Sequence, residues 1–366
     1  MYTVELDAER LVGQCVDAIR ECTNAPLNDC QTALQAVFRI LEPHMRTDDK
    51  LSKLLTSAET YQPDIEQCLD RVLLDKVSSK LYDIFLEKQE LSYSANQDDV
   101  ELCQSLELFC DITKKTDKRI PLAIVSRNDW DWMQLILVVL REEQSDTVRD
   151  LLITTIHTII TQCGAPTTQM LIDTQLAITL VSLSKKTTDI RGPALKLLAL
   201  LYTTESAPPL EQIDHLNSEY FRKLYYSPPG YYNKSDVLEL AINFSHHLDQ
   251  NPILLKSTDP VIDPISTDSY QCAEVGCCLI SDLNQSCSTR RLKFLSKIID
   301  LGTPILESLF YENDLKVLGH VLAREMINDS DKEIRELCRS NLQKLLDQNA
   351  IKSDEDIEYA ISNYNH

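Results

Sequence analysis

The sequence predicts an all-α protein in which successive antiparallel helix pairs stack as a solenoid. Three observations lead to this fold class: apolar residues recur at spacings of three and four along most of the chain, glycine is scarce, and one helix-opening pattern returns after 42 residues. We expect the 366 residues to form a single elongated helical domain over 1–366.

Apolar spacing indicates fourteen helical segments and almost no alternating pattern of the kind that strands show. They are expected at 7–20, 27–42, 63–88, 99–114, 128–141, 146–162, 167–184, 189–203, 209–225, 235–249, 268–282, 289–300, 313–327 and 331–347. Expected N-cap residues are Asn128, Ser145, Thr167 and Ser330, the last in a capping box with Glu333. Gly164 and Gly302 follow apolar runs and are expected to end helices. Two irregular stretches, 90–99 and 257–268, are expected to be loops within one array.

Glycine occurs seven times, against about 25 expected at an average usage of about 7%. Helix-dominated chains tolerate such scarcity because they need few turns and bulges. The scarcity also argues against a nucleotide-binding loop, which requires several neighbouring glycines so that backbone N–H groups can approach the phosphates.

A degenerate repeat supports the solenoid. The segments "SDTVRDLLITTI" (145–156), "TTDIRGPALKLL" (187–198) and "DKEIRELCRSNL" (331–342) each place an acid shortly before a β-branched residue, then arginine, then an apolar run. The first two are separated by 42 residues, Val148 to Ile190, and armadillo and HEAT repeats have periods of about 40 to 47 residues. An armadillo/HEAT-like solenoid is therefore expected.

The charge balance limits the possible partners. The 57 acidic and 36 basic residues give a formal charge of −21, and such a field repels nucleic acids and anionic membrane surfaces. No run of 18 apolar residues occurs, so no membrane insertion is expected. The opening "MYTVELDAER" does not resemble a secretory leader, which favours a cytoplasmic protein. A partner with a basic face would suit this charge.

The twelve cysteines are expected to be reduced, because most occupy apolar positions of helical patterns. The nearest approach to a metal cluster consists of Cys272, Cys277, Cys278 and Cys287 with His246 and His247 upstream. A structural zinc site requires paired ligands two to four residues apart, whereas "CAEVGCC" separates its thiols by five and six on an expected helix. No metal or cofactor is therefore expected.

No arrangement of residues indicates catalysis. The chain has no Gly-x-Ser-x-Gly elbow, and its many carboxylates, cysteines and histidines do not single out an acid–base pair. We expect a protein that is not an enzyme. A helical enzyme remains an alternative, and it would require a buried polar pocket with convergent titratable groups.

Two aromatic clusters have both a structural and a functional interpretation. Trp130 and Trp132 point about 200° apart on a helix, so one is expected in the core, while the other is either an interface anchor or partly covered by a loop. The stretch "YFRKLYYSPPGYYNKS" (220–235) is interpreted as a packed tyrosine corner, with a recognition edge as the alternative.

The segment "SLFYENDLKVLGHVLAREMIND" (308–329) first suggests a reaction site. If Asn313 caps a helix, Asp314 lies in its first turn and interacts with the positive helix end. Leu315, Leu318, Gly319, Leu322 and Met326 then share one packed face, and Val317 and Val321 form a second packed strip. Lys316, His320 and Arg324 remain as a basic ridge, which is either a docking strip or a solvated face balanced by nearby acids.

The segment 292–326 resembles the armadillo domain of the WISH/DIP family, the WASP-interacting SH3 proteins of animals and their fungal counterparts. The resemblance depends on Leu-Lys-Phe-Leu (292–295), on Phe310, Tyr311 and Asp314, and on Arg324 ten residues later. A weaker likeness extends it to about 125–345, whereas 1–124 is matched only by its helical character. Animal members carry an SH3 domain and a proline-rich region ahead of this domain, so the chain resembles the short fungal type or an excised domain.

The resemblance implies a function in actin assembly. It implies activation of the Arp 2/3 complex without a pre-existing mother filament, with actin and WASP-type activators as indirect partners and cortical actin patches, the sites of endocytosis, as the location. The expected partner-binding residues are Lys293, Tyr311, Lys316, His320 and Arg324. The alternative is a generic armadillo scaffold, such as the GTPase-binding or autoinhibitory domain of a formin-like regulator.

Overall fold

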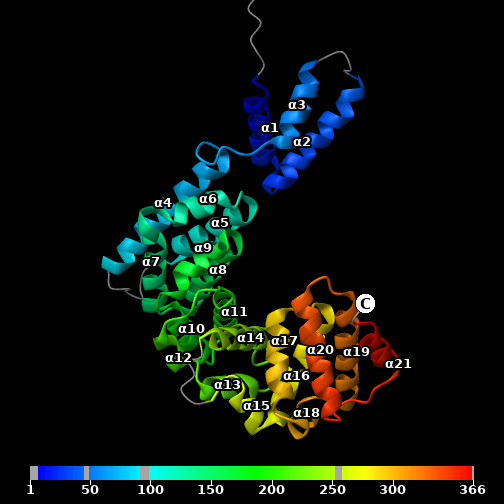
Figure 1. The fold of residues 1–366 in the computed structure, drawn as a ribbon. Coiled ribbons are helices and arrows are strands. Elements are labelled where there is room, and N and C mark those ends of the chain that lie inside the picture. The colour runs from blue at the N-terminus through cyan, green and yellow to red at the C-terminus, as the bar shows by residue number, and fades with distance from the viewer. Residues whose placement is uncertain (1–6, 45–48, 91–98, 252–257, 365–366) are drawn as a thin grey trace, which may run out of the picture. The chain divides into compact units, whose positions relative to one another are not determined.

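The computed structural model describes residues 7–44, 49–90, 99–251 and 258–364, and all regular structure within these ranges is helical (Figure 1). The predicted all-α class is confirmed. The chain divides into two compact units, unit 1 (1–167) and unit 2 (168–366), with the boundary inside helix α9 (Ala165–Ile172). The single domain expected over 1–366 stays a prediction.

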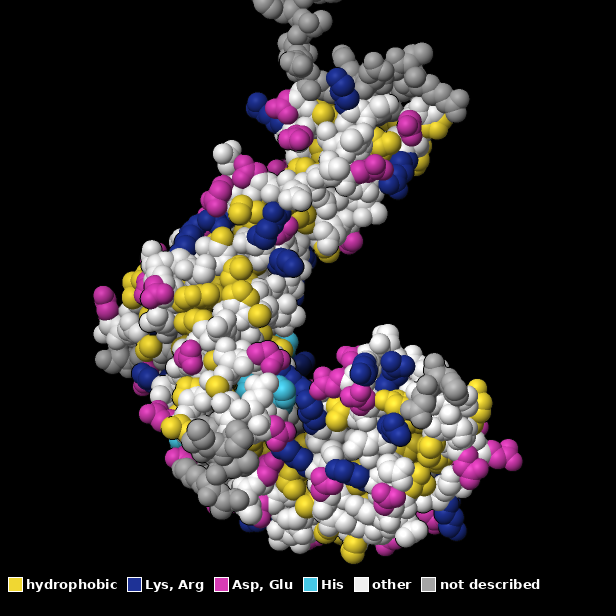
Figure 2. Space-filling model, viewed as in Figure 1, with side chains coloured by type: hydrophobic (Ala, Val, Ile, Leu, Met, Phe, Trp, Pro, Cys, Tyr) yellow, Lys and Arg dark blue, Asp and Glu magenta, His cyan; other side chains and the backbone are white. Residues whose placement is uncertain are grey.

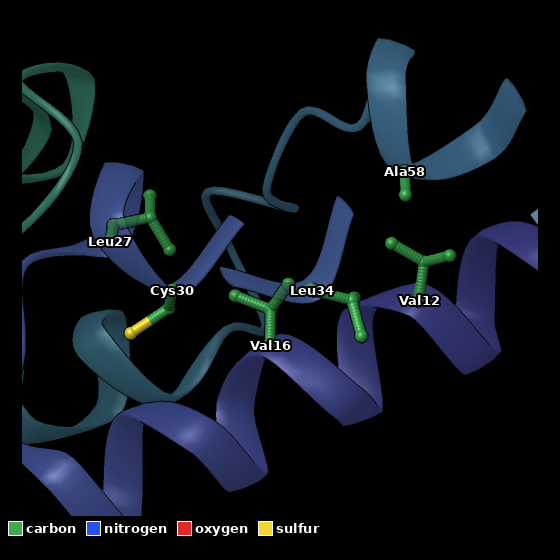
Figure 3. Packing of buried hydrophobic residues seen from close by; sticks show 6 residues of the cluster. All are labelled: Val12, Val16, Leu27, Cys30, Leu34 and Ala58. Atoms are coloured by element: carbon green, nitrogen blue, oxygen red, sulfur yellow. The ribbon is translucent and has the colours of Figure 1, made fainter. Parts of the chain in front are cut away.

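Unit 1 begins with a three-helix bundle. Its helices are α1 (Ala8–Thr23), α2 (Leu27–Leu41) and α3 (Asp49–Thr60), with a 3-10 turn at Glu42–His44. The three helices contact one another around a small apolar core (Figure 3). The buried residues of this core are Val12, Val16, Leu27, Cys30, Leu34 and Ala58.

The rest of unit 1 is a layered stack. It contains α4 (Leu69–Glu90), α5 (Val100–Lys115), α6 (Arg119–Val125), α7 (Arg127–Glu142) and α8 (Asp146–Cys163). Helix α5 packs between α4 and α8, and α6 contacts α4, α7 and α8. Trp132 lies at the centre, with its ring stacked on Phe109 at 5.1 Å between centroids and its Nε1 donating to the Ser78 carbonyl at 3.1 Å. It is the expected core tryptophan, while Trp130 is half-buried.

The start of α7 differs from the prediction. Asn128 does not cap the helix; Asn128, Asp129 and Trp130 all have left-handed backbone angles, with φ of 49°, 57° and 64°. Residues with a β-carbon pay a steric cost in this region, so the turn is a local strain that the hydrophobic pattern does not reveal.

Unit 2 contains the remaining helices. They are α10 (Leu176–Ser184), α11 (Arg191–Leu201), α12 (Leu210–His215), α13 (Ser218–Tyr225), α14 (Lys234–Gln250), α15 (Asp263–Thr267), α16 (Ala273–Gln285), α17 (Thr289–Ile299), α18 (Thr303–Leu309), α19 (Glu312–Asn328), α20 (Lys332–Asp347) and α21 (Glu355–Asn363), with a 3-10 turn η3 at Ser269–Cys272.

The helices of unit 2 stack on their nearest neighbours (Figure 1). Helix α11 packs on α10 and α14, α14 packs on both α16 and α17, and this pair packs on α19 and α20 respectively. Helix α21 closes the series against α19. Stacking of each helix pair on the next is the arrangement of an α-solenoid, so the predicted armadillo/HEAT-like architecture is confirmed.

Several predicted boundaries were wrong. Segment 167–184 is two helices interrupted at Asp173–Gln175, and 209–225 is two helices interrupted at Leu216–Asn217. Ser330 is not an N-cap, because Asp331 occupies that position and accepts the Glu333 N–H at 2.8 Å. Helix α15 lies within the expected loop 257–268, of which residue 257 lies outside the described residues, as does most of 90–99. Helices α3, α6, α18 and α21 were not predicted.

The tyrosine-rich stretch 220–235 is a packed corner, as expected. The hydroxyl of Tyr220 lies 2.8 Å from Ser184 Oγ, and Tyr232 donates to the Ser184 carbonyl at 2.7 Å. Tyr225 donates to the Val261 carbonyl at 3.2 Å. All three hydroxyls have backbone or side-chain hydrogen-bond partners. These bonds link α13 and the turn after it to α10 and to the segment before α15.

Candidate protein-interaction site

Helix α19 carries most of the predicted site, and its start differs from the expected one. Tyr311 occupies the N-cap position with an extended backbone and no side-chain hydrogen bond. Asn313 is therefore inside the helix and is not its cap. Glu312 and Asp314 lie in the first turn, where carboxylates interact favourably with the positive end of the helix dipole. Asp314 thus has the structural role that the sequence suggested.

The packed face of α19 is the predicted one. Leu315, Leu318, Leu322 and Met326 are buried. Gly319 permits close approach of the C-terminal segment, because a β-carbon at this position would lie 3.0 Å from Ile351 Cδ1 and 3.5 Å from Ile357 Cδ1. The second strip was expected to be packed, and this holds for Val321, which is buried. Val317 is instead 43% exposed.

The basic ridge is exposed, but each of its members has a polar partner in the same chain. Lys316 Nζ lies 3.0 Å from Glu312 Oε1, and its side chain is 58% exposed. His320 faces Asp354 and Asp356 of the segment that opens α21. Figure 2 shows the same interspersion of basic and acidic side chains over the visible face of unit 2. The ridge therefore presents hydrogen-bonding groups more than a net positive field.

Arg324 links α19 to its neighbour α16. Its Nε lies 2.6 Å from Glu325 Oε1, and its guanidinium donates to both the side-chain and backbone oxygens of Asn284 at 3.2 Å. This arginine keeps 45% of its side-chain surface exposed. It is thus fixed in orientation and accessible at the same time.

The other two predicted residues lie apart from this ridge. Lys293 belongs to α17 and pairs with Glu333 of α20 at 2.9 Å. Tyr311 is 67% exposed at the start of α19. The structure therefore brings His320 and Arg324 together, while Lys293 and Tyr311 belong to other parts of the surface. The partner-binding role of all five residues stays a prediction.

A groove of about 450 Å³ lies between α16, α19 and α21. Its lining residues are Asn284, Val317, His320, Val321, Ala323, Arg324, Ile327, Asp356, Tyr359 and Ala360. Val317, Ile327 and Tyr359 give it exposed apolar surface, with Tyr359 64% exposed. An exposed apolar surface bordered by polar groups is typical of a protein-binding groove. We refer to it as the α19–α21 groove.

Sequence reasoning missed the α21 wall of this groove. The last expected helix ended at 347, although "DEDIEYAISN" contains the signals of another. Asp354 accepts the Ile357 N–H at 3.1 Å as an N-cap, and Ile357 and Ala360 are buried three residues apart. Apolar periodicity gives only a weak signal here, because the few apolar residues stand in a strongly acidic segment.

The cysteines and histidines that come nearest to a metal cluster in the sequence do not converge within the described ranges. Cys272 is buried, Cys277 is exposed, and the pKa of both thiols is raised by burial, to about 12 for Cys272. His246 pairs instead with Glu205 at 3.4 Å, and His247 is buried against the Tyr202 carbonyl. Within the described ranges, the one group of possible metal ligands that converges is His320 with Asp354 and Asp356. All twelve cysteines are free, and six of them are buried.

Among the described residues, no helix is both long enough and apolar enough to span a membrane.

Comparisons with known proteins give one informative match. No curated protein matches significantly. Two similar solved structures are a designed armadillo repeat protein (14% identity, TM-score 0.41, covering 74% of this chain and 99% of that one) and an engineered protein (14% identity, TM-score 0.43, covering 94% and 86%). Residues 232–359 match the SPIN90/Ldb17 leucine-rich domain, a range that includes α14 to α20 and most of α21. This match confirms the resemblance to the WISH/DIP family over residues 232–359.

Proposed function

We propose that the chain is a non-enzymatic activator of the Arp 2/3 complex, which it binds to start actin filaments without a mother filament. The family match over 232–359 carries this proposal. The resulting product is a linear seed filament from which later branching can begin. The proposed location is the cytoplasm, at cortical actin patches.

The proposed mechanism is a shift of a conformational equilibrium. A binding protein favours the active arrangement of its target only by the difference in its affinity for the active and inactive arrangements. Moving an equilibrium from 1:99 to 99:1 requires about 10⁴-fold tighter binding to the active form, or about 5.5 kcal/mol. Contacts of this total strength need an extended surface, which a solenoid face supplies.

The α19–α21 groove is the proposed centre of this surface. Arg324 and Tyr359 resemble the side chains that dominate protein interfaces, and Val317 and Ile327 offer apolar contact between them. Lys293, Tyr311 and Lys316 lie outside the groove lining and are proposed as further contacts with the same partner.

Pyrene-actin assembly without preformed seeds tests the activity. The chain is expected to accelerate filament formation in the presence of the Arp 2/3 complex and to be retained by the immobilised complex in a pull-down. No acceleration over the complex alone would contradict the proposal. Binding that depends on a GTPase, with no effect on the complex, would instead favour the formin-like scaffold.

A pair of matched variants tests the groove. Val317→Glu places a charge in the groove, and Val37→Glu places the same charge on α2 of unit 1, where Val37 is 50% exposed. Neither substitution buries a charge, so both variants are expected to fold. Val317→Glu is expected to weaken binding by at least about tenfold, a loss of about 1.4 kcal/mol, and Val37→Glu to leave binding unchanged. Equal behaviour of the two variants would exclude the groove as the contact surface.

A further inference from the structure

His320, Asp354 and Asp356 form a cluster of possible metal ligands from two separate elements. His320 belongs to α19, Asp354 is the N-cap of α21, and Asp356 lies in the first turn of α21. One ligand atom from each residue lies within 4.8 Å of the other two. None of these three residues was expected to bind a metal or cofactor.

The distances within the cluster suit a first-row divalent metal ion. Zinc binds imidazole nitrogen and carboxylate oxygen at about 2.0 to 2.2 Å in a tetrahedron, so neighbouring ligand atoms lie roughly 3.3 Å apart. His320 Nε2 and Asp354 Oδ2 are 3.1 Å apart. Asp356 Oδ2 lies 3.8 Å from His320 Nδ1, and its side chain is 85% exposed. Asp356 thus faces the other ring nitrogen, and its exposed carboxylate must turn toward Asp354 to share one ion with it.

The ligands are held by their surroundings. The second carboxylate oxygen of Asp354 accepts the Ile357 N–H at 3.1 Å, which fixes the orientation of the carboxylate. Ligating carboxylates are commonly oriented by such hydrogen bonds. The close approach of Ile351 and Ile357 to Gly319 fixes α21 against α19 one residue away from His320. The two halves of the cluster therefore sit on helices whose packing is already set.

The local charge favours a cation. The first turn of α21 carries Glu355, Asp356 and Glu358, whereas Lys316, one turn from His320, is paired with Glu312. A divalent ion would neutralise both aspartates and use an imidazole lone pair. Mixed nitrogen and oxygen ligands favour zinc-like ions over magnesium or calcium, which prefer six or more oxygen ligands.

We propose that His320, Asp354 and Asp356 bind one Zn²⁺ or a similar divalent ion, with water completing the coordination, and that the ion clamps α21 onto α19. Because His320 and Asp356 also line the α19–α21 groove, the bound ion lies at its edge and holds its α21 wall in place. The proposal does not depend on any action on the Arp 2/3 complex.

Zinc titration of the metal-free protein by isothermal calorimetry at pH 7.5 tests the site. The expected result is one equivalent bound by the full chain, with a zinc-dependent rise in melting temperature and no comparable rise with Mg²⁺. His320→Ala and Asp356→Asn each alter an exposed side chain and are expected to lower affinity at least about tenfold. Glu355→Gln removes the same charge from the neighbouring residue and is expected to bind as the natural chain does.

Two results would overturn the proposal. One is equal zinc affinity in the natural chain and in the variant that combines His320→Ala with Asp356→Asn. The other is an equal loss in Glu355→Gln, which would mean that the ion senses only the general negative charge of α21. Co²⁺ absorption provides a second readout, because nitrogen and oxygen coordination lacks the charge-transfer band of thiolates. A thiolate band that persists in the double variant would assign the metal to the cysteines.

Discussion

The two units stabilise their interiors with different polar chemistry. Unit 1 buries pairs of opposite charges: Arg20 Nε lies 3.1 Å from Asp70 Oδ1, and Lys88 Nζ lies 2.6 Å from Glu143 Oε2, with all four residues less than 10% exposed. These pairs join α1 to α4 and α4 to the end of α7. Partly exposed Asp99 also binds Lys88, at 2.7 Å.

Unit 2 relies more on neutral side chains that donate to backbone carbonyls. Asn341 Nδ2 donates to the Leu292 carbonyl at 3.0 Å, which joins α20 to α17. Gln212 Nε2 donates to the Ile172 carbonyl at 2.6 Å, and His247 Nε2 faces the Tyr202 carbonyl at 3.1 Å. Lys234 is a charged exception, and it too donates to carbonyls, at the end of α13.

The difference predicts distinct vulnerabilities. A buried charge that loses its partner remains uncompensated in a medium of low dielectric, which strongly destabilises the fold. Loss of a neutral donor to a buried carbonyl costs much less free energy. Unit 1 is therefore expected to be sensitive to the removal of single charges. Unit 2 is expected to be sensitive to the protonation of its buried neutral groups.

The largest expected effect comes from Asp70→Ala. It leaves Arg20 buried without its carboxylate and is expected to destabilise unit 1 by about 3 to 5 kcal/mol. Both tryptophans, Trp130 and Trp132, belong to unit 1, so tryptophan fluorescence during urea unfolding reports this unit separately from far-UV circular dichroism. The control combines Asp70→Leu with Arg20→Met, which replaces the pair by apolar side chains and is expected to recover most of the loss. Equal losses in the single and double variants would show that the ion pair itself is not the cause.

The next effect concerns the pH dependence of unit 2. Burial lowers the pKa of His247 from its ordinary value of 6.5, and the Tyr202 carbonyl only partly opposes this. Nε2 must carry the proton that the carbonyl accepts, while Nδ1 has no hydrogen-bond partner. The unfolded chain therefore binds a proton at a higher pH than the folded one, and the stability present above about pH 6.5 falls as pH is lowered toward the folded pKa.

Unit 1 responds in a lower pH range. Burial alone would raise the pKa of Glu143, but hydrogen bonds from Lys88 and from the Ser145 and Gln144 N–H groups outweigh it and lower the pKa below 4.5. The stability contribution of Glu143 is thus kept until the pH falls below about 4.5.

The His247 prediction is tested by thermal unfolding followed by circular dichroism from pH 8 to 5. The melting temperature is expected to decline over this range, and His247→Gln is expected to reduce the decline. A decline of the same size in that variant would exclude His247 as its source.

The sequence predicts the fold class but not the buried ion pairs and hydrogen bonds that distinguish the two units. Apolar spacing identifies which face of α19 is buried, because Leu315, Leu318 and Leu322 recur at helical intervals. It cannot identify that Arg20 meets Asp70, since these residues are 50 positions apart and their approach depends on tertiary packing. The sequence also gives no local signal for the left-handed turn at 128–130, because none of its residues is glycine.

The candidate site was predictable in part for the same physical reasons. The exposed ridge of Lys316, His320 and Arg324 follows from helical periodicity, and the structure places all three at the surface. The acids that face His320 did not follow, because Asp354 and Asp356 belong to the α21 segment, where no helix was predicted. Glu312 and Glu325, which pair with Lys316 and Arg324, belong to α19 itself.

The smallest expected effect on stability comes from Lys293→Ala in unit 2. Lys293 and Glu333 form an exposed pair, with side-chain exposures of 43% and 55%, and such pairs contribute about 0 to 1 kcal/mol. The melting temperature is therefore expected to change little, in contrast with Asp70→Ala. If Lys293 contacts a partner, binding to the immobilised Arp 2/3 complex weakens while stability does not. Lys332→Ala is a matched control, because Lys332 is also exposed and pairs with Glu336 at 3.5 Å within α20. Unchanged binding in Lys293→Ala would remove this residue from the proposed interface.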